Sequence, residues 1–543
     1  AQGLEALTEA ANRLILLGSY IQLTLSVDAT CAPALALLDK LMNLQVEAEQ
    51  LSSAFARYVG ALPDLKAVIQ GNDAFAPYSF MLTDAAEQAA HLLPEALEPT
   101  VLRMQMTGGR AWEQLRNLMD GTMQVELVQD GQTVSLPLPE VRNMAYSGDP
   151  ALRKAAYEAE LAAYPKVETA MAACLNGIKG EALTLADLKG YDSVLDMTLA
   201  HSRMDRATLE AMLTAIREAL PDFRRYLKAK AKLLGHAKGL PFYDLFAPVG
   251  SSGHTYTLEE ARDYLLRVLG PFSPNMAEVI RRAFDERWID AYPRPGKQGG
   301  AFCNGLHPLG QSRVMTNFDG TFGAVTTLAH ELGHAFHDYC LKEEAVLNTD
   351  YPMPLAETAS IFNETLMTQA ALAQAEPEEA FSLLENELME ANQVVVDILS
   401  RYLFETEVVE TRKQRTLTAQ ELQDIMLRAQ RESYGDGLDA DYLHPYMWAC
   451  KSHYYSADVH FYNFPYAFGL LFGKGIYARY EAQGASFVPA YERLLALCGK
   501  DTVAGVAAGV GIDVRSVDFW RSSLDILRQD IDRFEALVAQ RLS

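Results

Sequence analysis

The sequence HELGH, residues 330–334, places two histidines four residues apart, with a glutamate directly after the first. Residues four apart share one face of a helix, so His330 and His334 can bind the same metal ion. Glu331 lies about 100° further round the helix axis, where it can approach a metal-bound water without ligating the metal. With 11 histidines and 71 acidic residues, such a pattern arises by chance roughly 0.03 times in this chain. The motif therefore predicts a catalytic zinc site with Glu331 as general base.

A catalytic zinc also needs a third protein ligand and one position left open for water. His337 is on the same face, but it lies roughly 10.5 Å along the helix axis from His330. The two cannot share one ion, so His337 is predicted to pack or to support a ligand. Another zinc-protease pattern has histidine at the position of Cys340, and this chain does not follow it.

The segment PMPLAETASIFNETL, residues 352–366, follows the histidine motif and is predicted to be a helix. Glu357 would lie in its first turns, and Glu364 seven residues on would share its face. Glu357 is the predicted third ligand, and Glu364 is a candidate to orient a ligand histidine. On spacing alone, a solvated acid at a helix start explains Glu357 equally well.

A donor for the oxyanion of peptide hydrolysis is expected from the aromatic segment at residues 444–469. This segment contains His444, His453, His460 and many tyrosines, and tyrosine is a neutral donor on a stiff ring at pH 7. Most of these aromatic residues are expected to fill the core.

Two segments before the histidine motif could align a peptide. Residues 312–320 are predicted to be an edge strand, which can pair with the backbone of an extended peptide of any sequence. GGAF at residues 299–302 could serve likewise, because glycine allows close approach. A plain sheet strand is an equally good interpretation.

The elements that must position these residues are mostly helices. Apolar residues recur every three to four positions in five long segments: 33–59, 208–235, 258–284, 378–413 and 517–541. One hairpin is predicted around Asp130-Gly131, and a boundary near residue 110 would separate an N-terminal helical lobe (1–110) from a catalytic domain (111–543). The predicted fold class is mainly α.

Composition excludes several functions. The net charge of −24 argues against nucleic acid as partner. No apolar run is long enough to span a membrane, and a cytoplasmic location is expected. The six cysteines form no Cys-x-x-Cys pair, so we expect reduced, mostly buried thiols.

The zinc region resembles the thimet oligopeptidase and oligoendopeptidase F family of zinc peptidases. TLAHELGHAFH resembles its zinc helix, PLAETASIFNE its third-ligand helix, and GGAFC and SRVMTNFDGT the segments before the zinc helix. FYDLFAP and FYNFPYAFGLLF are also similar to oligoendopeptidase F, and the resemblance runs from about residue 140 to the C-terminus.

The resemblance implies two largely helical lobes that flank a deep substrate channel, with a small β-sheet beside the zinc helix. It implies one Zn²⁺ per chain, bound by His330, His334 and Glu357, and cleavage of short unfolded peptides within the chain. It also implies that a histidine and two tyrosines face the substrate, here His453, Tyr462 and Tyr466. The spacings differ from thimet oligopeptidase, and His460 competes with His453.

Two other functions fit parts of the pattern. A peptide-binding protein that had lost catalysis would not need Glu331, which is present together with all three predicted ligands. A zinc carboxypeptidase on a related fold would need a positive group for the terminal carboxylate of its substrate, and the sequence does not locate one.

Overall fold

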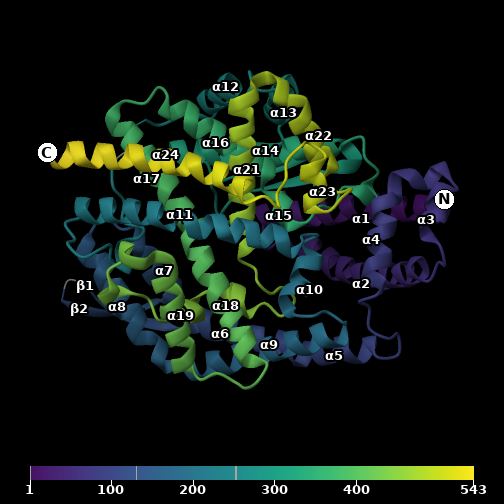
Figure 1. Ribbon diagram of the computed structural model, residues 1–543, viewed down its shortest axis with the longest axis horizontal. Helices are drawn as coiled ribbons and strands as arrows, with labels where there is room; N and C mark the ends of the chain where they lie inside the picture. The colour runs from purple at the N-terminus through teal and green to yellow at the C-terminus, as the bar shows by residue number, and fades with distance from the viewer. Residues whose placement is uncertain (1, 130, 251–253) are drawn as a thin grey trace.

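A computed structural model describes residues 2–129, 131–250 and 254–543, and most of them are helical (Figure 1). The elements up to the small sheet are α1 Gln2–Val27, α2 Ala32–Gly60, α3 Leu65–Gln70, α4 Ser79–Ala89, α5 Glu98–Thr107, α6 Gly109–Thr122, β1 Gln124–Gln129, β2 Gln132–Pro137, α7 Leu138–Asn143, α8 Pro150–Ala163, α9 Glu168–Leu188, α10 Val194–His201, α11 Arg206–Leu233, α12 Leu258–Leu269 and α13 Pro274–Asp285.

The small sheet and the remaining helices follow. They are β3 Ile289–Asp290, β4 Phe302–Leu306, β5 Gln311–Met315, α14 Phe322–Leu341, α15 Met353–Ala356, α16 Thr358–Leu372, α17 Pro377–Asn392, α18 Ile398–Arg412, α19 Ala419–Tyr434, α20 Met447–Cys450, α21 Phe464–Gln483, α22 Val488–Leu497, α23 Val503–Ala508 and α24 Val517–Leu542. The fold is mainly α, as the periodicity predicts.

The helices gather in two largely helical halves. In Figure 1, α12, α13, α14, α16, α21 and α22 lie in the upper half, and α6, α8, α9, α18 and α19 lie in the lower half. The N-terminal helices α1 to α4 form a group at one side, where α2 packs against both α1 and α4. The division at residue 110 remains a prediction.

Two of the five predicted long helices are interrupted. The segment 258–284 divides into α12 and α13 because Gly270 ends the first helix and Ser273-Pro274 begins the second. The Ser273 hydroxyl accepts a hydrogen bond from the Met276 amide at 3.2 Å and caps α13. The segment 378–413 divides at a π-helical turn, Gln393–Asp397. The apolar period continues across both interruptions, which explains why the sequence predicts single helices.

The predicted hairpin is present. β1 and β2 pair antiparallel along their full length, and Gly131 has a φ of 77°, which glycine adopts readily. Asp130, the other predicted turn residue, lies outside the described residues.

The prediction of an edge strand at residues 312–320 is wrong in two respects. β5 ends at Met315, and it is the central strand of a sheet with the order β3-β5-β4. It pairs parallel with β3 on one side and antiparallel with β4 on the other, so its backbone groups are occupied. Among the described residues, the edge strands of this sheet are the short β3 and the longer β4, and β4 begins at Phe302, the last residue of GGAF. The sheet packs against α14 through β4 and β5.

Glycines allow the three helices α14, α16 and α21 to pack closely. A Cβ on Gly333 of α14 would lie 2.7 Å from the Ala359 carbonyl oxygen of α16. A Cβ on Gly473 of α21 would lie 2.7 Å from Ile361 Cγ2. Larger residues at these positions would push the helices apart, and so glycine determines the spacing around the histidine motif.

No helix within the described ranges is both long and apolar enough to cross a membrane. All six cysteines are free, as expected; Cys174 and Cys498 are buried and the other four are partly buried.

Candidate metal centre and active site

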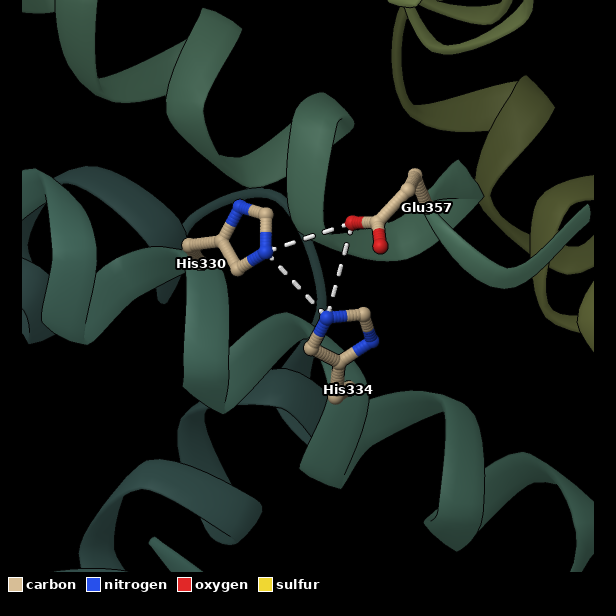
Figure 2. Close-up of side chains that lie close together, drawn as sticks. All are labelled: His330, His334 and Glu357. Carbon is tan, nitrogen blue, oxygen red and sulfur yellow. Dashed lines mark hydrogen bonds and ion pairs between the residues drawn. The ribbon is translucent and has the colours of Figure 1, made fainter. Parts of the chain in front are cut away.

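Three side chains converge where α14 meets the junction of α15 and α16. His330 and His334 extend from the same face of α14 towards Glu357 (Figure 2). The two Nε2 atoms are 3.2 Å apart, and Glu357 Oε2 lies 3.2 Å from His330 Nε2 and 3.5 Å from His334 Nε2. Among the described residues, these three form a group with the composition and proximity of a metal site.

The distances between these atoms fit a tetrahedral zinc site. Zinc binds histidine nitrogen and carboxylate oxygen at about 2.0–2.1 Å, so two such ligands at the tetrahedral angle lie about 3.3 Å apart. The three separations, 3.2, 3.2 and 3.5 Å, match that value. Two histidines and one glutamate leave the fourth position for water or substrate, which is the arrangement of a catalytic site and not of a structural one.

The sequence predicts that Glu357 lies in the first turns of a helix, but the structure places it between two helices. The two prolines begin α15, which ends at Ala356, and α16 begins at Thr358. Glu357 occupies the break between them, with φ −88° and ψ 5°. The Ser360 hydroxyl donates a hydrogen bond to Glu357 Oε2 at 2.7 Å and holds the carboxylate in place. The break turns Glu357 towards the two histidines.

Glu364, on α16, orients the first histidine. Its Oε1 accepts a hydrogen bond from His330 Nδ1 at 3.0 Å. In the neutral imidazole a proton on Nδ1 leaves the lone pair on Nε2, so this contact selects the tautomer that can bind a metal once the Nε2 proton has left.

The charges of the site favour a bound cation. Burial lowers the pKa of His330, but the hydrogen bonds and charges of Glu357 and Glu364 outweigh it and raise the pKa to about 11. Burial opposes ionisation of Glu357, yet its contacts with His330 and His334 hold its pKa at about 2. Burial lowers the pKa of His334 to about 4, so this histidine is neutral at pH 7 and its nitrogen lone pair is available.

Glu331 is buried beside this group, with 5% of its surface exposed. Burial raises its pKa to about 7, opposed by the charge of His330 and reinforced by Glu357 and Glu364. A carboxyl group with this pKa can accept and release a proton near neutral pH, which a general base must do.

His453, Tyr462 and Tyr466 form a second cluster. The Tyr466 hydroxyl lies 3.4 Å from His453 Nε2. The Tyr462 ring stacks on the His453 ring, with centroids 5.4 Å apart, and meets the Tyr466 ring edge-on, with centroids 5.2 Å apart. Gly469, one turn after Tyr466 on α21, lies against Glu357: a Cβ there would be 2.9 Å from Glu357 Cβ. Tyr466 therefore faces the metal-site residues, and burial raises its hydroxyl pKa, so the proton stays available for donation.

The other histidines of the sequence analysis lie elsewhere. His460 is buried with its Nδ1 3.4 Å from Lys179 Nζ, and it does not join Tyr462 or Tyr466. His444 packs against Phe242 in a different part of the core. His337 is fully buried and stacks on Tyr351.

Sequence reasoning missed Ser360, Gly469 and Asn363, which position the site. Asn363 Nδ2 donates to the Ala329 carbonyl at 3.1 Å and joins α16 to α14 next to His330. A sequence signal existed only for the glycine: Gly469 and Gly473 lie four apart, the spacing that creates a groove for a neighbouring helix.

Comparisons with known protein families agree with this geometry. Peptidase family M3 matches residues 143–526, and Oligopeptidase F matches residues 63–124. The chain is 24% identical to Oligopeptidase PepF of Bacillus subtilis, over 98% of this chain and 81% of that protein. It is 25% identical to Group B oligopeptidase PepB of Streptococcus agalactiae, over 83% of this chain and 75% of that protein.

Solved structures share the fold. A putative peptidase from Chlamydophila abortus superposes with a TM-score of 0.88 at 23% identity, covering 98% of this chain and 90% of that one. Oligoendopeptidase-F from Enterococcus faecium superposes with a TM-score of 0.74 at 18% identity, covering 99% and 93% of the two chains. Because the M3 match spans most of the sequence and includes the histidine motif, this chain belongs to peptidase family M3 and is a metalloendopeptidase.

Proposed function

We propose that this protein is a zinc-dependent endopeptidase that hydrolyses short, unfolded oligopeptides. The observation that carries the proposal is the convergence of His330, His334 and Glu357 at tetrahedral ligand separations, with Glu331 buried beside them. These three residues would hold one Zn²⁺. When bound, zinc lowers the pKa of water and polarises a carbonyl group.

Glu331 is the proposed general base. Its carboxylate accepts a proton from the attacking water and later delivers it to the leaving amine, so one residue serves both proton transfers. The raised pKa of about 7 suits both steps, because the group neither holds nor releases the proton too strongly. His330 keeps its orientation through Glu364, and Ser360 keeps that of Glu357.

Tyr466 is the proposed donor to the oxyanion, with Tyr462 and His453 as its neighbours. The hydroxyl of Tyr466 lies on the side of α21 that faces Glu357, and its raised pKa keeps it protonated. A neutral donor placed in advance stabilises negative charge on the scissile carbonyl without having to reorganise.

The variant Tyr466→Phe is expected to reduce kcat by roughly 10²-fold with little change in KM, because it removes the hydroxyl and keeps the ring. Tyr462→Phe is expected to have a comparable or smaller effect. Tyr480→Phe, a half-buried tyrosine further along α21, is the matched control and should retain activity. Full kcat in both single variants and in the double variant would exclude the tyrosines and leave His453 as the donor.

The unpaired side of β4 is the proposed place for the substrate backbone. β4 packs against α14, and the charge of Glu331 acts on Cys303 of this strand, so the strand runs beside the predicted base. A peptide that adds to a strand edge is bound through its main chain and must be extended, which excludes folded proteins.

Mass spectrometry of fragments from a mixed peptide library tests the proposed function against its alternatives. We expect cuts inside short peptides by the zinc-loaded protein, and no cleavage of a stably folded protein of similar composition. Removal of single C-terminal residues would favour a zinc carboxypeptidase, and binding without cleavage would favour a peptide-binding protein. Efficient digestion of the folded protein would contradict the restriction to unfolded chains.

A further inference from the structure

A cavity with a volume of about 200 Å³ lies between α7, α8, the π-helical turn and α20. None of the proposed metal ligands or oxyanion donors lines it. Its walls combine aromatic rings with cationic and polar groups, among them Arg142, Tyr146, Tyr157, Gln393, His444 and Lys451. Such a mixture is typical of a ligand pocket, in which apolar walls enclose a few polar groups that select the ligand.

The positive charges that line the cavity are not all neutralised. Arg142 pairs with Glu160, and Arg153 Nε donates to Asp244 Oδ1 at 2.7 Å. Lys451 differs from both: it is partly exposed, and within the described ranges no carboxylate lies within 4.0 Å of its ammonium group and no residue accepts a hydrogen bond from it. The cavity therefore has one cation without a protein partner.

Asp397 is the acid whose charge raises the pKa of Lys451, and this carboxylate already has two other hydrogen-bond partners. Asp397 Oδ2 accepts a hydrogen bond from Arg401 Nε at 2.7 Å, and its Oδ1 accepts one from the Tyr434 hydroxyl at 3.3 Å. Burial, followed by the charge of Arg401, lowers the pKa of Lys451. A partly buried ammonium group without a close counter-ion costs some stability, and a carboxylate that entered the cavity would reduce that cost.

Two segments of the chain link the cavity to the proposed active site. Lys451 precedes His453 by two residues, and its charge acts on that imidazole, which lies beside Tyr466. Gln393 follows Glu390 by three residues, and the charges of Glu364 and His330 act on the Glu390 carboxyl group. The inference requires that a peptide held at the metal site extend one end or one side chain into the cavity.

We propose that Lys451 binds a carboxylate of the peptide substrate in this cavity, and so acts as a specificity determinant. The inference rests on the proposed endopeptidase function. The carboxylate belongs either to the C-terminus of the peptide or to an Asp or Glu side chain. The first source would favour cleavage at a set distance from the C-terminus, and the second would favour an acidic residue at a set distance from the cut.

Matched peptides distinguish the two sources with the zinc-loaded wild-type protein. One pair differs only in a free or an amidated C-terminus. A second set is amidated throughout and has Glu or Gln at each position in turn. Because a hydrogen bond to a charged partner is lost, we expect kcat/KM to fall by roughly 10-fold or more for the uncharged member of one set. Ratios near one in both sets would overturn the proposal.

Variants assign the effect to Lys451. Lys451→Met keeps most of the side-chain length and removes the charge, so the acid-to-neutral ratio of kcat/KM should fall to about one, whereas Lys451→Arg should keep most of the preference. Lys66→Met changes an exposed lysine on α3 and controls for net charge. The same ratio in Lys451→Met as in wild type would overturn the assignment. Its Tm should be equal or higher, since an unpaired and partly buried charge is removed, and a large fall in Tm would indicate a structural role instead.

Binding separates failure of this inference from failure of the proposed function. If wild type cleaves none of the peptides, the endopeptidase proposal fails, and fluorescence anisotropy with labelled peptides and Glu331→Gln still tests the cavity. Tighter binding of the acid member, abolished by Lys451→Met in the Glu331→Gln background, would support the inference. Equal binding of both members would overturn it.

Discussion

Glu331→Gln is expected to bind zinc normally and to lose at least roughly 10²-fold in kcat, the lower part of the range for a general base. The amide has nearly the same shape as the carboxyl group, so the packing of α14 should persist. It cannot accept a proton, however, and the attacking water would lose its base. Since Glu331 is 5% exposed, no bulk base can readily replace it.

The measurement combines metal content by inductively coupled plasma mass spectrometry with steady-state kinetics on a short peptide. Glu343→Gln makes the same chemical change at an exposed position just beyond α14 and should have no effect. Near-normal turnover by zinc-loaded Glu331→Gln would show that another group acts as base.

Glu357→Ala is expected to lose zinc and, with it, nearly all activity. It removes one of three ligands and leaves two histidines whose Nε2 atoms are 3.2 Å apart. The loss of zinc affinity should exceed the 10–100-fold that is typical of changes in the groups that support ligands. His330→Ala and His334→Ala should behave in the same way.

Glu364→Gln provides the graded comparison, because Glu364 touches His330 Nδ1 at 3.0 Å and not the site where the three ligand atoms meet. Its zinc affinity should fall within that 10–100-fold range. Zinc affinity is measured by competition with a chelator of known affinity, with Glu343→Gln again as the control. If Glu357→Ala keeps full zinc and activity, the third ligand lies elsewhere and Glu364 is the next candidate.

Local patterns in the sequence predicted much of the fold. The mainly helical class, the hairpin of β1 and β2, and the long helices α2, α11 and α24 follow from apolar periodicity and turn residues. One predicted helix divides into α12 and α13 at Ser273-Pro274, and another divides into α17 and α18 at the π-helical turn. The apolar period continues across both breaks, so the sequence predicts a single helix in each case.

Part of the proposed metal site could be predicted for the same reason. His330, Glu331 and His334 lie within one and a half helical turns, so their relative positions depend on helix geometry alone. Glu357 is 23 residues beyond His334, and its approach depends on the break between α15 and α16 and on Gly469 of α21. The spacing of residues along the sequence does not predict contacts between such distant segments.

The sequence by itself determined the residue types of the chemistry and the helix that presents two of the predicted ligands, because that geometry repeats every 3.6 residues. Tertiary structure decided which strand lies at the centre of the sheet, which of His453 and His460 meets the two tyrosines, and that the cavity-lining Lys451 has no carboxylate partner among the described residues. Each of these outcomes depends on segments far apart in the chain: β5 is central because β3 and β4 both pair with it, and His460 is buried against Lys179 of α9. Packing between distant elements assigns those neighbours, and no local period encodes them.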